Sequence, residues 1–347
     1  MAYTVIDKST DYFNTKLYTG NGGTQNITGV GHQVDWTWIK HRGDTEGHGL
    51  FDVVRGALYR LQSSGTTVSS SQSGTVTAFG SDGFSIGNNA EVNANTASYV
   101  SWNWKAGTSF SNDASSTSVG SIDSSGSVST TSGFSIIKWS GANATSTVAH
   151  GLGVAPKVLL VKSLANTTTW MVQHTGIGNA KEIYLNNNSA SGNSTAWNST
   201  SPTTTVFTVT GGAGDGVNHS GDYIAYCFAE VKGFSKFGSY IGNANANGAF
   251  VYTGFKPAWI LIKSTGAGES WQILDNKRST FNPADDILMA DLTNAESAVS
   301  GRATDFVSNG FKFRGTEGGT NTTATYIYMA FAESPFVNSS GIPTTAR

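Results

Sequence analysis

The chain has 347 residues, of which 38% are hydrophobic and 13% charged, and its formal net charge is −2. This size and apolar content suffice for two or three compact domains. The near-neutral charge gives no electrostatic footprint for nucleic acid or anionic lipid, so we expect no nucleic-acid partner. No stretch reaches the roughly 18 apolar residues that span a bilayer. The N-terminus shows no secretion-signal pattern, so we expect neither membrane insertion nor export.

The turn-forming residues predict an all-β fold. Gly is abundant at 42 residues and Pro scarce at six, a mixture that suits short strands joined by tight turns. Without a long helical pattern, we predict antiparallel β-sandwich, jelly-roll-like units of about 100 residues. One short helix is expected near residues 291–298. The single cysteine, Cys227, lies in an apolar strand pattern, which predicts a buried and inert thiol.

One spacing of residues occurs three times. A Lys that closes an apolar run follows a turn glycine by 20, 21 and 21 residues, and an aromatic-rich closing strand comes later. The residues concerned are Gly20, Lys40 and Tyr99, then Gly141, Lys162 and Tyr223, then Gly242, Lys263 and Tyr326. A repeat of roughly 100 residues is a whole domain, so the spacing predicts three tandem sandwiches.

The predicted boundaries follow from this spacing. Residues 1–106 form the first unit with an N-terminal arm, 133–232 the second, and 233–347 the third with a C-terminal tail. Residues 107–132 are a Ser/Thr/Gly-rich run, which predicts a flexible or extended linker. Because the connection at 230–238 is short, we expect the last two units to form a rigid pair and the first to be more freely placed.

Within each unit the strongest strand ends at the recurring Lys. Residues 156–162 and 257–263 are continuous apolar runs that begin with Pro, which indicates central strands covered on both faces. A second strand is expected to begin with an aromatic residue, at Phe51, Trp170 and Trp271. The rings of the closing strand are expected to form the core.

Few residues point to catalysis. Of the six histidines, no two stand at metal-ligand spacing beside a carboxylate or thiolate, so we expect no metal site and no cofactor. Asp285, Asp286 and Asp291 form either a calcium site or, as we favour, a solvated acidic turn. No catalytic residue is assigned, and we expect a protein that is not an enzyme.

Two carboxylate and guanidinium pairs are spaced alike. Asp52 and Arg55 are three residues apart, as are Asp275 and Arg278. They are either an acid/base or substrate clamp, or structural pairs that fasten a strand end to its loop. The second unit carries His174 in place of the Asp and no matching Arg, which favours the structural interpretation.

Trp197 is the one candidate for ligand contact. It lies in a polar loop, and exposed aromatic rings commonly stack on sugars, so we name it as a glycan contact. A Trp that caps a sheet or meets another subunit is the alternative.

Nearly the whole chain, from about residue 3 to 347, resembles a family of repeat proteins found in virions of marine tailed bacteriophages, described as tail-fibre or other virion structural proteins. The residues that carry the resemblance are 11–22, 50–56, 225–230, 252–258, 275–278, 308–311 and 330–333. Unlike a typical long fibre, the chain shows no anchoring domain, coiled-coil heptads or β-spiral shaft.

The resemblance implies a non-enzymatic structural surface protein of a virion, assembled in the host cytoplasm. A tail-fibre or tail-appendage component for host adsorption is expected. A capsid decoration or knob protein is the first alternative, and a polysaccharide depolymerase or carbohydrate-binding module is the second. The partners implied are other virion proteins, further copies of the chain in a homo-oligomer, and a host cell-surface glycan.

Overall fold

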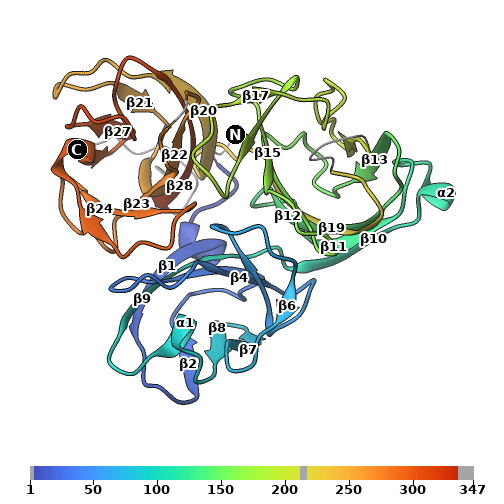
Figure 1. Cartoon of the computed structure of the whole chain (residues 1–347), viewed down its shortest axis with the longest axis horizontal. Coiled ribbons are helices and arrows are strands. Elements are labelled where there is room, and N and C mark those ends of the chain that lie inside the picture. The colour runs from blue at the N-terminus through green and yellow to red at the C-terminus, as the bar shows by residue number, and fades with distance from the viewer. Residues whose placement is uncertain (1–3, 212–216, 267, 335–347) are drawn as a thin grey trace.

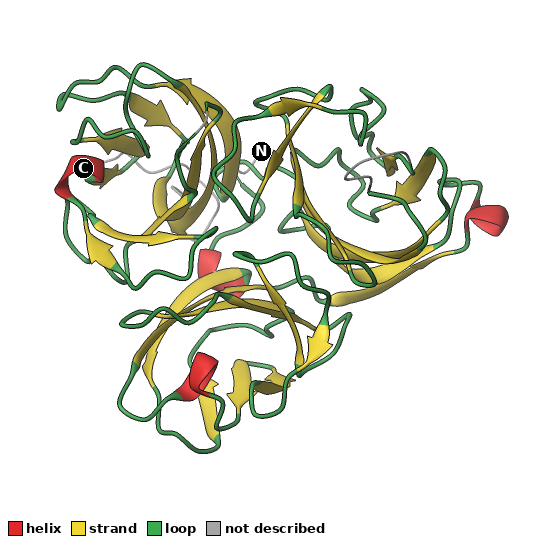
Figure 2. Ribbon diagram, viewed as in Figure 1, coloured by secondary structure: helices red, strands yellow, loops and turns green. Residues whose placement is uncertain are grey.

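The computed structural model describes residues 4–211, 217–266 and 268–334, and its regular structure is almost entirely β. All its named strands pair antiparallel, which confirms the all-β prediction (Figure 2). The helices in these residues are short: η1 (Ser9–Asp11), α1 (Ala90–Asn93), α2 (Ala114–Thr117) and η2 (Ser300–Arg302). None of them is long and apolar enough to cross a membrane.

The first unit has a large and a small sheet. The large sheet has the order β1-β9-β3-β4-β5-β6 and the small one β2-β8-β7. The strands are β1 (Phe13–Thr19), β2 (Gln25–Thr28), β3 (Trp36–His41), β4 (Gly49–Asp52), β5 (Tyr59–Gln62), β6 (Ser70–Ser71), β7 (Val76–Gly80), β8 (Gly83–Ile86) and β9 (Ser98–Trp104).

The second unit has a longer large sheet, in the order β10-β11-β12-β19-β14-β15-β16-β17, and a small sheet of β13 and β18. The strands are β10 (Thr108–Asn112), β11 (Ser124–Ser129), β12 (Phe134–Gly141), β13 (Ser146–Ala149), β14 (Val158–Ser163), β15 (Met171–His174), β16 (Lys181–Tyr184), β17 (Gly192–Asn193), β18 (Val206–Val209) and β19 (Gly221–Phe228).

The third unit has the large sheet β20-β28-β22-β23-β24-β25 and the small sheet β21-β27-β26. The strands are β20 (Ser235–Ile241), β21 (Phe250–Tyr252), β22 (Lys256–Ser264), β23 (Gln272–Asp275), β24 (Asp286–Met289), β25 (Ser297–Ala298), β26 (Thr304–Val307), β27 (Gly310–Phe313) and β28 (Thr325–Ser334).

The three large sheets share one strand order once β10 and β11 are set aside. In each, the closing strand (β9, β19 or β28) lies between the opening strand and the central strand (β3, β14 or β22). The register aligns Trp36 with Trp104, Val158 with Phe228 and Trp259 with Phe331. Counting from these pairs, Lys40, Lys162 and Lys263 occupy corresponding positions, as do Asp52, His174 and Asp275.

The three units surround a common core (Figure 1). Trp104, Phe228 and Phe331, which correspond by register, meet there edge to face, with ring centroids 5.7 to 6.5 Å apart. Each unit also has a core of its own between its two sheets. The large sheets are therefore covered on both faces, which is why all residues of β3 and β14 are buried.

The shared core overturns one expectation about domain arrangement. Trp36 of the first unit stacks on Tyr226 of the second at 4.4 Å, and Trp104 meets Trp259 of the third at 5.6 Å. The first unit is thus packed against both others, and the expectation that it is more freely placed is wrong. Aromatic rings that the sequence assigned to separate cores fill a joint one.

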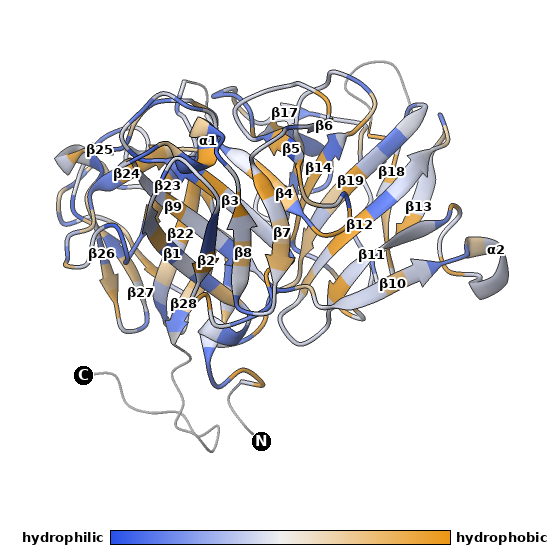
Figure 3. Cartoon of the chain, turned by 90° about the horizontal axis from the view of Figure 1, so that it is seen from below, coloured by the Kyte–Doolittle hydropathy of each residue, from blue (hydrophilic) through white to orange (hydrophobic). Residues whose placement is uncertain are grey.

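The expected linker at residues 107–132 is also wrong. It forms β10, α2 and β11, which extend the large sheet of the second unit beyond β12 (Figure 3). We call residues 107–132 the insertion. Its polar composition suits an edge of a sheet, where main-chain hydrogen bonds rather than apolar contacts hold the strands.

The helix expected at residues 291–298 does not form. The segment begins in a turn and continues without regular structure to β25, where Ser297 pairs with Ile287. The Glu296 amide donates to the Arg42 carbonyl at 2.7 Å, so this segment is held across the boundary with the first unit. Tertiary hydrogen bonds here outweigh a weak local preference for helix.

Candidate functional site

Trp197, the expected glycan contact, is fully buried. It lies in the core of the second unit together with Phe207 and Val209. The Thr210 amide donates to the Ala196 carbonyl at 3.0 Å and holds the polar loop down over that core. A side chain with 0% exposure cannot stack on a sugar, so the expectation is wrong.

Both carboxylate and guanidinium pairs are formed, and both are buried. Arg55 Nε lies 2.6 Å from Asp52 Oδ2, and Arg278 Nε lies 2.6 Å from Asp275 Oδ2. The other oxygen of each carboxylate accepts main-chain amides of the following loop, including that of the Arg itself. Each Arg also donates to a carbonyl of the strand that precedes it, at Leu50 in β4 and Ile273 in β23. These contacts fasten the strand end to its loop, as the structural interpretation requires.

The last residues of β4, β15 and β23 also join the units, and we call these bonds the strand-end contacts. Tyr226 Oη donates to Asp52 at 2.8 Å, which joins the second unit to the first. Trp102 Nε1 donates to Asp275 at 3.0 Å, which joins the first to the third. His174 Nε2 lies 3.1 Å from the Tyr328 carbonyl, which joins the second to the third. The three bonds close a ring.

The residues just before the same strands form a second ring, the strand-start contacts. Their ring nitrogens bond to carbonyl oxygens of corresponding residues at the ends of β24, β5 and β16. The bonds are His48 to Met289 at 3.0 Å, Trp170 to Gln62 at 2.8 Å, and Trp271 to Tyr184 at 2.8 Å. Each unit thus donates to one neighbour and accepts from the other.

This register corrects the alignment of the second strands. His48, not Phe51, corresponds to Trp170 and Trp271. Trp38 Nε1 donates to His48 Nδ1 at 2.8 Å, so the proton of the imidazole is on Nε2 and points to Met289. The imidazole replaces the indole as the donor across the boundary between the units. Aromatic type alone does not reveal this equivalence, because Phe51 lies close by in sequence.

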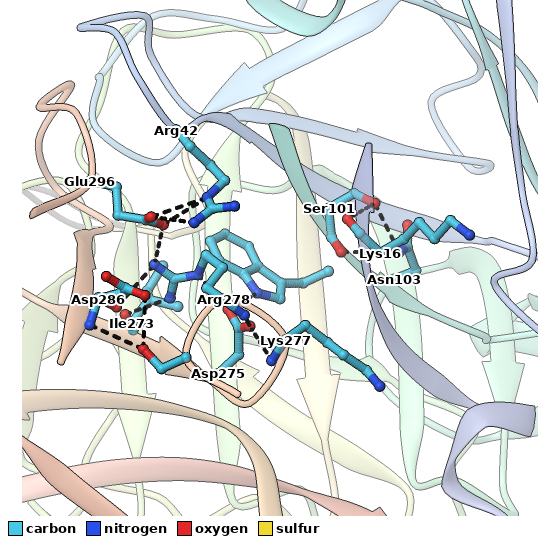
Figure 4. A network of polar contacts seen from close by, with 12 residues as sticks. Lys16, Arg42, Ser101, Asn103, Ile273, Asp275, Lys277, Arg278, Asp286 and Glu296 are labelled. Carbon is cyan, nitrogen blue, oxygen red and sulfur yellow. Dashed lines mark hydrogen bonds and ion pairs between the residues drawn. The ribbon is translucent and has the colours of Figure 1, made fainter. Parts of the chain in front are cut away.

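Glu296 adds an ionic contact between the first and third units (Figure 4). Arg42 Nε lies 3.0 and 3.1 Å from the two carboxylate oxygens, and Arg278 approaches from the other side at 3.0 Å. The Arg278 guanidinium also lies 5.6 Å from the ring of Trp102. Buried ionic groups at this boundary are therefore paired, as their desolvation requires.

Lys40, Lys162 and Lys263 are all buried. Each Nζ donates to the carbonyl of the next residue, at 2.6, 3.0 and 2.8 Å. Burial lowers the pKa of all three to about 8. Lys263 also donates to the Ser189 carbonyl of the second unit at 3.1 Å. Each Lys is the next-to-last residue of its central strand, and Lys263 alone among the three connects two units.

In the part of the chain that the structure describes, no group of three or more His, Cys, Asp or Glu side chains is placed to hold an ion. Asp291 is buried, so the favoured solvated acidic turn is wrong for this residue. It accepts the Trp271 amide at 2.9 Å, and burial raises its pKa. Cys227 is buried as expected, and burial raises its pKa to about 12.

The insertion forms the rim of a surface groove of about 670 Å³ on the second unit. Its walls are mainly Ser, Asn and Asp side chains of the insertion, together with residues 138–140 of β12 and Asp222 of β19. Asp222 pairs with Lys138 at 2.8 Å, and this bond lowers the pKa of its carboxyl. The pKa of Asp113 is lowered too, by hydrogen bonds from Ser115 and Ser116. Neither carboxyl is thus suited to donate a proton near neutral pH.

Comparison with known proteins identifies a family but no characterised relative. Residues 8–335 match the protein family described as a domain of unknown function, DUF7483. No curated protein and no solved structure matches the chain. Because the match covers most of its length, the chain belongs to the DUF7483 family.

Proposed function

We propose that the chain is a non-enzymatic structural surface protein of a tailed-phage virion, a tail-fibre or tail-appendage component that contributes to host adsorption. The virion assignment rests on the resemblance described above. The structural role is supported by the strand-end and strand-start contacts, in which the buried polar side chains join the three units.

The burial and the bonding partners of Asp52 and Asp275 are the main support for a non-enzymatic role. A catalytic acid/base pair needs two groups that face a substrate and have different pKa values. Asp52 and Asp275 are instead buried, each bonded to an Arg and to a side chain of another unit. Buried pairs of this kind stabilise an assembly and leave no open face for a substrate.

The groove on the second unit favours carbohydrate binding as a second candidate function. Hydroxyl, amide and carboxylate groups line it, and these can form hydrogen bonds with sugar hydroxyls. Asp113 and Asp222 of the groove have lowered pKa values, whereas a depolymerase would need a raised pKa for its general acid. Retention of a polysaccharide without cleavage is therefore the expected behaviour.

Two experiments test the proposal. Cryo-electron microscopy of the particle is expected to show the chain as a component of the tail, and density on the capsid would instead support a decoration protein. Absence from the purified particle would contradict the virion assignment. Incubation with host capsule or lipopolysaccharide is expected to release no reducing ends, and their release would contradict the non-enzymatic assignment.

A further inference from the structure

The small sheets present three corresponding edge strands with different surroundings. Phe84, Phe207 and Phe311 pair with Ile27, Val148 and Val251, which aligns the edge strands β2, β13 and β21. Ile27, Val148 and Val251 face inward, and each has two neighbours in its strand. These neighbours are Asn26 and Thr28 in β2, Thr147 and Ala149 in β13, and Phe250 and Tyr252 in β21. An unpaired edge of this kind is a template for pairing with another chain.

In the second unit, the insertion covers this edge. Ile122 forms a parallel bridge with Val148, and the Ser121 amide donates to the Thr147 carbonyl at 2.8 Å. Ser121 Oγ accepts the Thr147 amide at 2.8 Å, and Ser124 Oγ donates to the Ala149 carbonyl at 2.9 Å. The outward main-chain groups of β13 are thus occupied by an extended segment of the same chain.

In the first unit, the edge has no such cover among the described residues, but it is polar. Asn26 and Thr28 are exposed, and Asn26 Oδ1 accepts a hydrogen bond from Ser85 at 2.7 Å. Polar side chains on an open edge weaken unwanted association with other chains.

In the third unit, the described part of the chain leaves the edge open, and the edge is aromatic. β21 has one neighbour, β27, in the sheet order of the described chain. Phe250 is 48% exposed and Tyr252 61% exposed, while Val251 between them faces the core. A Cβ on Gly310 would lie 3.0 Å from the Phe250 ring, so this ring covers Gly310 of the neighbouring strand. Two large exposed rings beside an unpaired main-chain edge form an apolar surface patch, which is typical of an interaction site.

We propose that β21 binds an extended segment of a partner protein, which adds to the small sheet as residues 121–124 add to β13. The free edge supplies main-chain hydrogen bonds, and Phe250 and Tyr252 contact alternate side chains of the added segment. The main-chain edge favours a polypeptide over a sugar, which would need the rings alone. Residues 121–124 cover β13 as an extended segment that belongs to no second small sheet, so the matching occupant of β21 is an extended segment of a partner rather than β21 of a second copy.

The segment that covers β13 supplies the probe. A fluorescent peptide with the sequence of residues 118–126 is titrated against the full chain, and hydrogen exchange locates the site. We expect saturable binding that protects the amides of residues 250–252. The double variant Phe250→Thr with Tyr252→Thr replaces both rings by Thr, which occurs at the corresponding positions 147 and 28 of the other units. It should weaken binding at least tenfold. Phe281→Thr is the matched control, because Phe281 is 85% exposed and lies outside β21, and it should leave binding unchanged.

Four outcomes of the binding experiment would overturn the proposal. They are the absence of saturable binding, protection elsewhere in the chain, equal affinity of the double variant, and displacement of the peptide by a soluble oligosaccharide. A dimer of the wild-type chain that the double variant abolishes would assign the edge to a second copy instead. The proposal does not depend on the virion role, since its readout is peptide binding by the isolated chain.

Discussion

His174 Nε2 lies 3.1 Å from the main-chain carbonyl oxygen of Tyr328, and this hydrogen bond joins the second unit to the third. Nδ1 accepts the Gly176 amide at 2.9 Å, so the proton is on Nε2. At the corresponding position, Asp275 accepts a hydrogen bond from Trp102. At the position that corresponds to Trp102, the third unit has Met329. Its thioether cannot donate a hydrogen bond to the second unit. A histidine that donates to the adjacent carbonyl keeps the ring of contacts closed.

Replacing His174 tests this reading of the ring. His174→Ala removes the hydrogen bond to the Tyr328 carbonyl and the acceptor of the Gly176 amide, and it leaves a cavity, so we expect a loss of about 2–4 kcal/mol in the free energy of unfolding. His174→Asp should cost at least as much, because a carboxylate would face a carbonyl. Urea denaturation at pH 7 measures both. Lys181→Ala, at an exposed position in β16, is the control and should change stability by less than about 0.5 kcal/mol. A stable His174→Asp variant would contradict the assigned donor.

The sequence predicted the elements of each unit better than the way the units meet. The central strands and their terminal lysines follow from apolar runs, which are local signals. The strand-end contacts could not be predicted, because Asp52 and Tyr226 are 174 residues apart and their pairing depends on how whole sheets pack.

Composition misled the prediction at the insertion and at Trp197. Ser, Thr and Gly suit a flexible segment and an edge strand equally well, and the choice depends on whether β12 offers a free edge. Trp197 stands among polar residues, yet its ring fills the core of the second unit. A polar neighbourhood in sequence does not show which way a single side chain points.

The rings at the centre should couple the units energetically. Phe331→Ala removes a ring that contacts Trp104 and Phe228, and we expect a loss of about 3–5 kcal/mol. In a double-mutant cycle with Trp104→Ala, the coupling energy should be at least about 0.5 kcal/mol, since the two rings meet edge to face at 5.7 Å. Additive losses would contradict direct contact between the units. Phe281→Ala, at an exposed site, should be neutral.

Acid should weaken the fold through its buried histidines. Burial lowers the pKa of His32, His150 and His174 to about 4. An unfolded histidine binds its proton near pH 6.5, so each contributes stability that is complete above that pH and is lost as the pH falls towards 4. Burial raises the pKa of Asp35, Glu91 and Asp291, and these groups act in the opposite direction.

A difference measurement isolates one histidine from these opposing groups. His150 accepts the Leu152 amide at Nδ1 and bonds to the Thr203 carbonyl through Nε2. His150→Gln should destabilise the chain at pH 7, and the difference from wild type should shrink by up to about 3 kcal/mol at pH 4. Urea denaturation at both pH values measures this. An unchanged difference would mean that His150 titrates normally in the fold.

Lys162 should show a pH dependence of the same sign as that of His150, but in the alkaline range. Burial lowers its pKa to about 8, below the usual 10.5. Between these values the unfolded chain binds more protons, so its contribution to stability rises with pH. Relative to Lys162→Met, the wild type should gain up to about 1.4 kcal/mol per pH unit between pH 8 and 10. Denaturation of both proteins at pH 7, 8, 9 and 10 measures the gain. If the free energy of unfolding depends on pH in the same way in both proteins, the lowered pKa of Lys162 is contradicted.

Differential scanning calorimetry of the full chain tests most directly whether the three units form one closed ring around a shared core. We predict a single transition in which the calorimetric and van't Hoff enthalpies agree, because no unit can unfold without exposing the core of the other two. The same single transition should move to lower temperature in His174→Ala. Two or three separable transitions, with His174→Ala shifting one of them alone, would contradict the account.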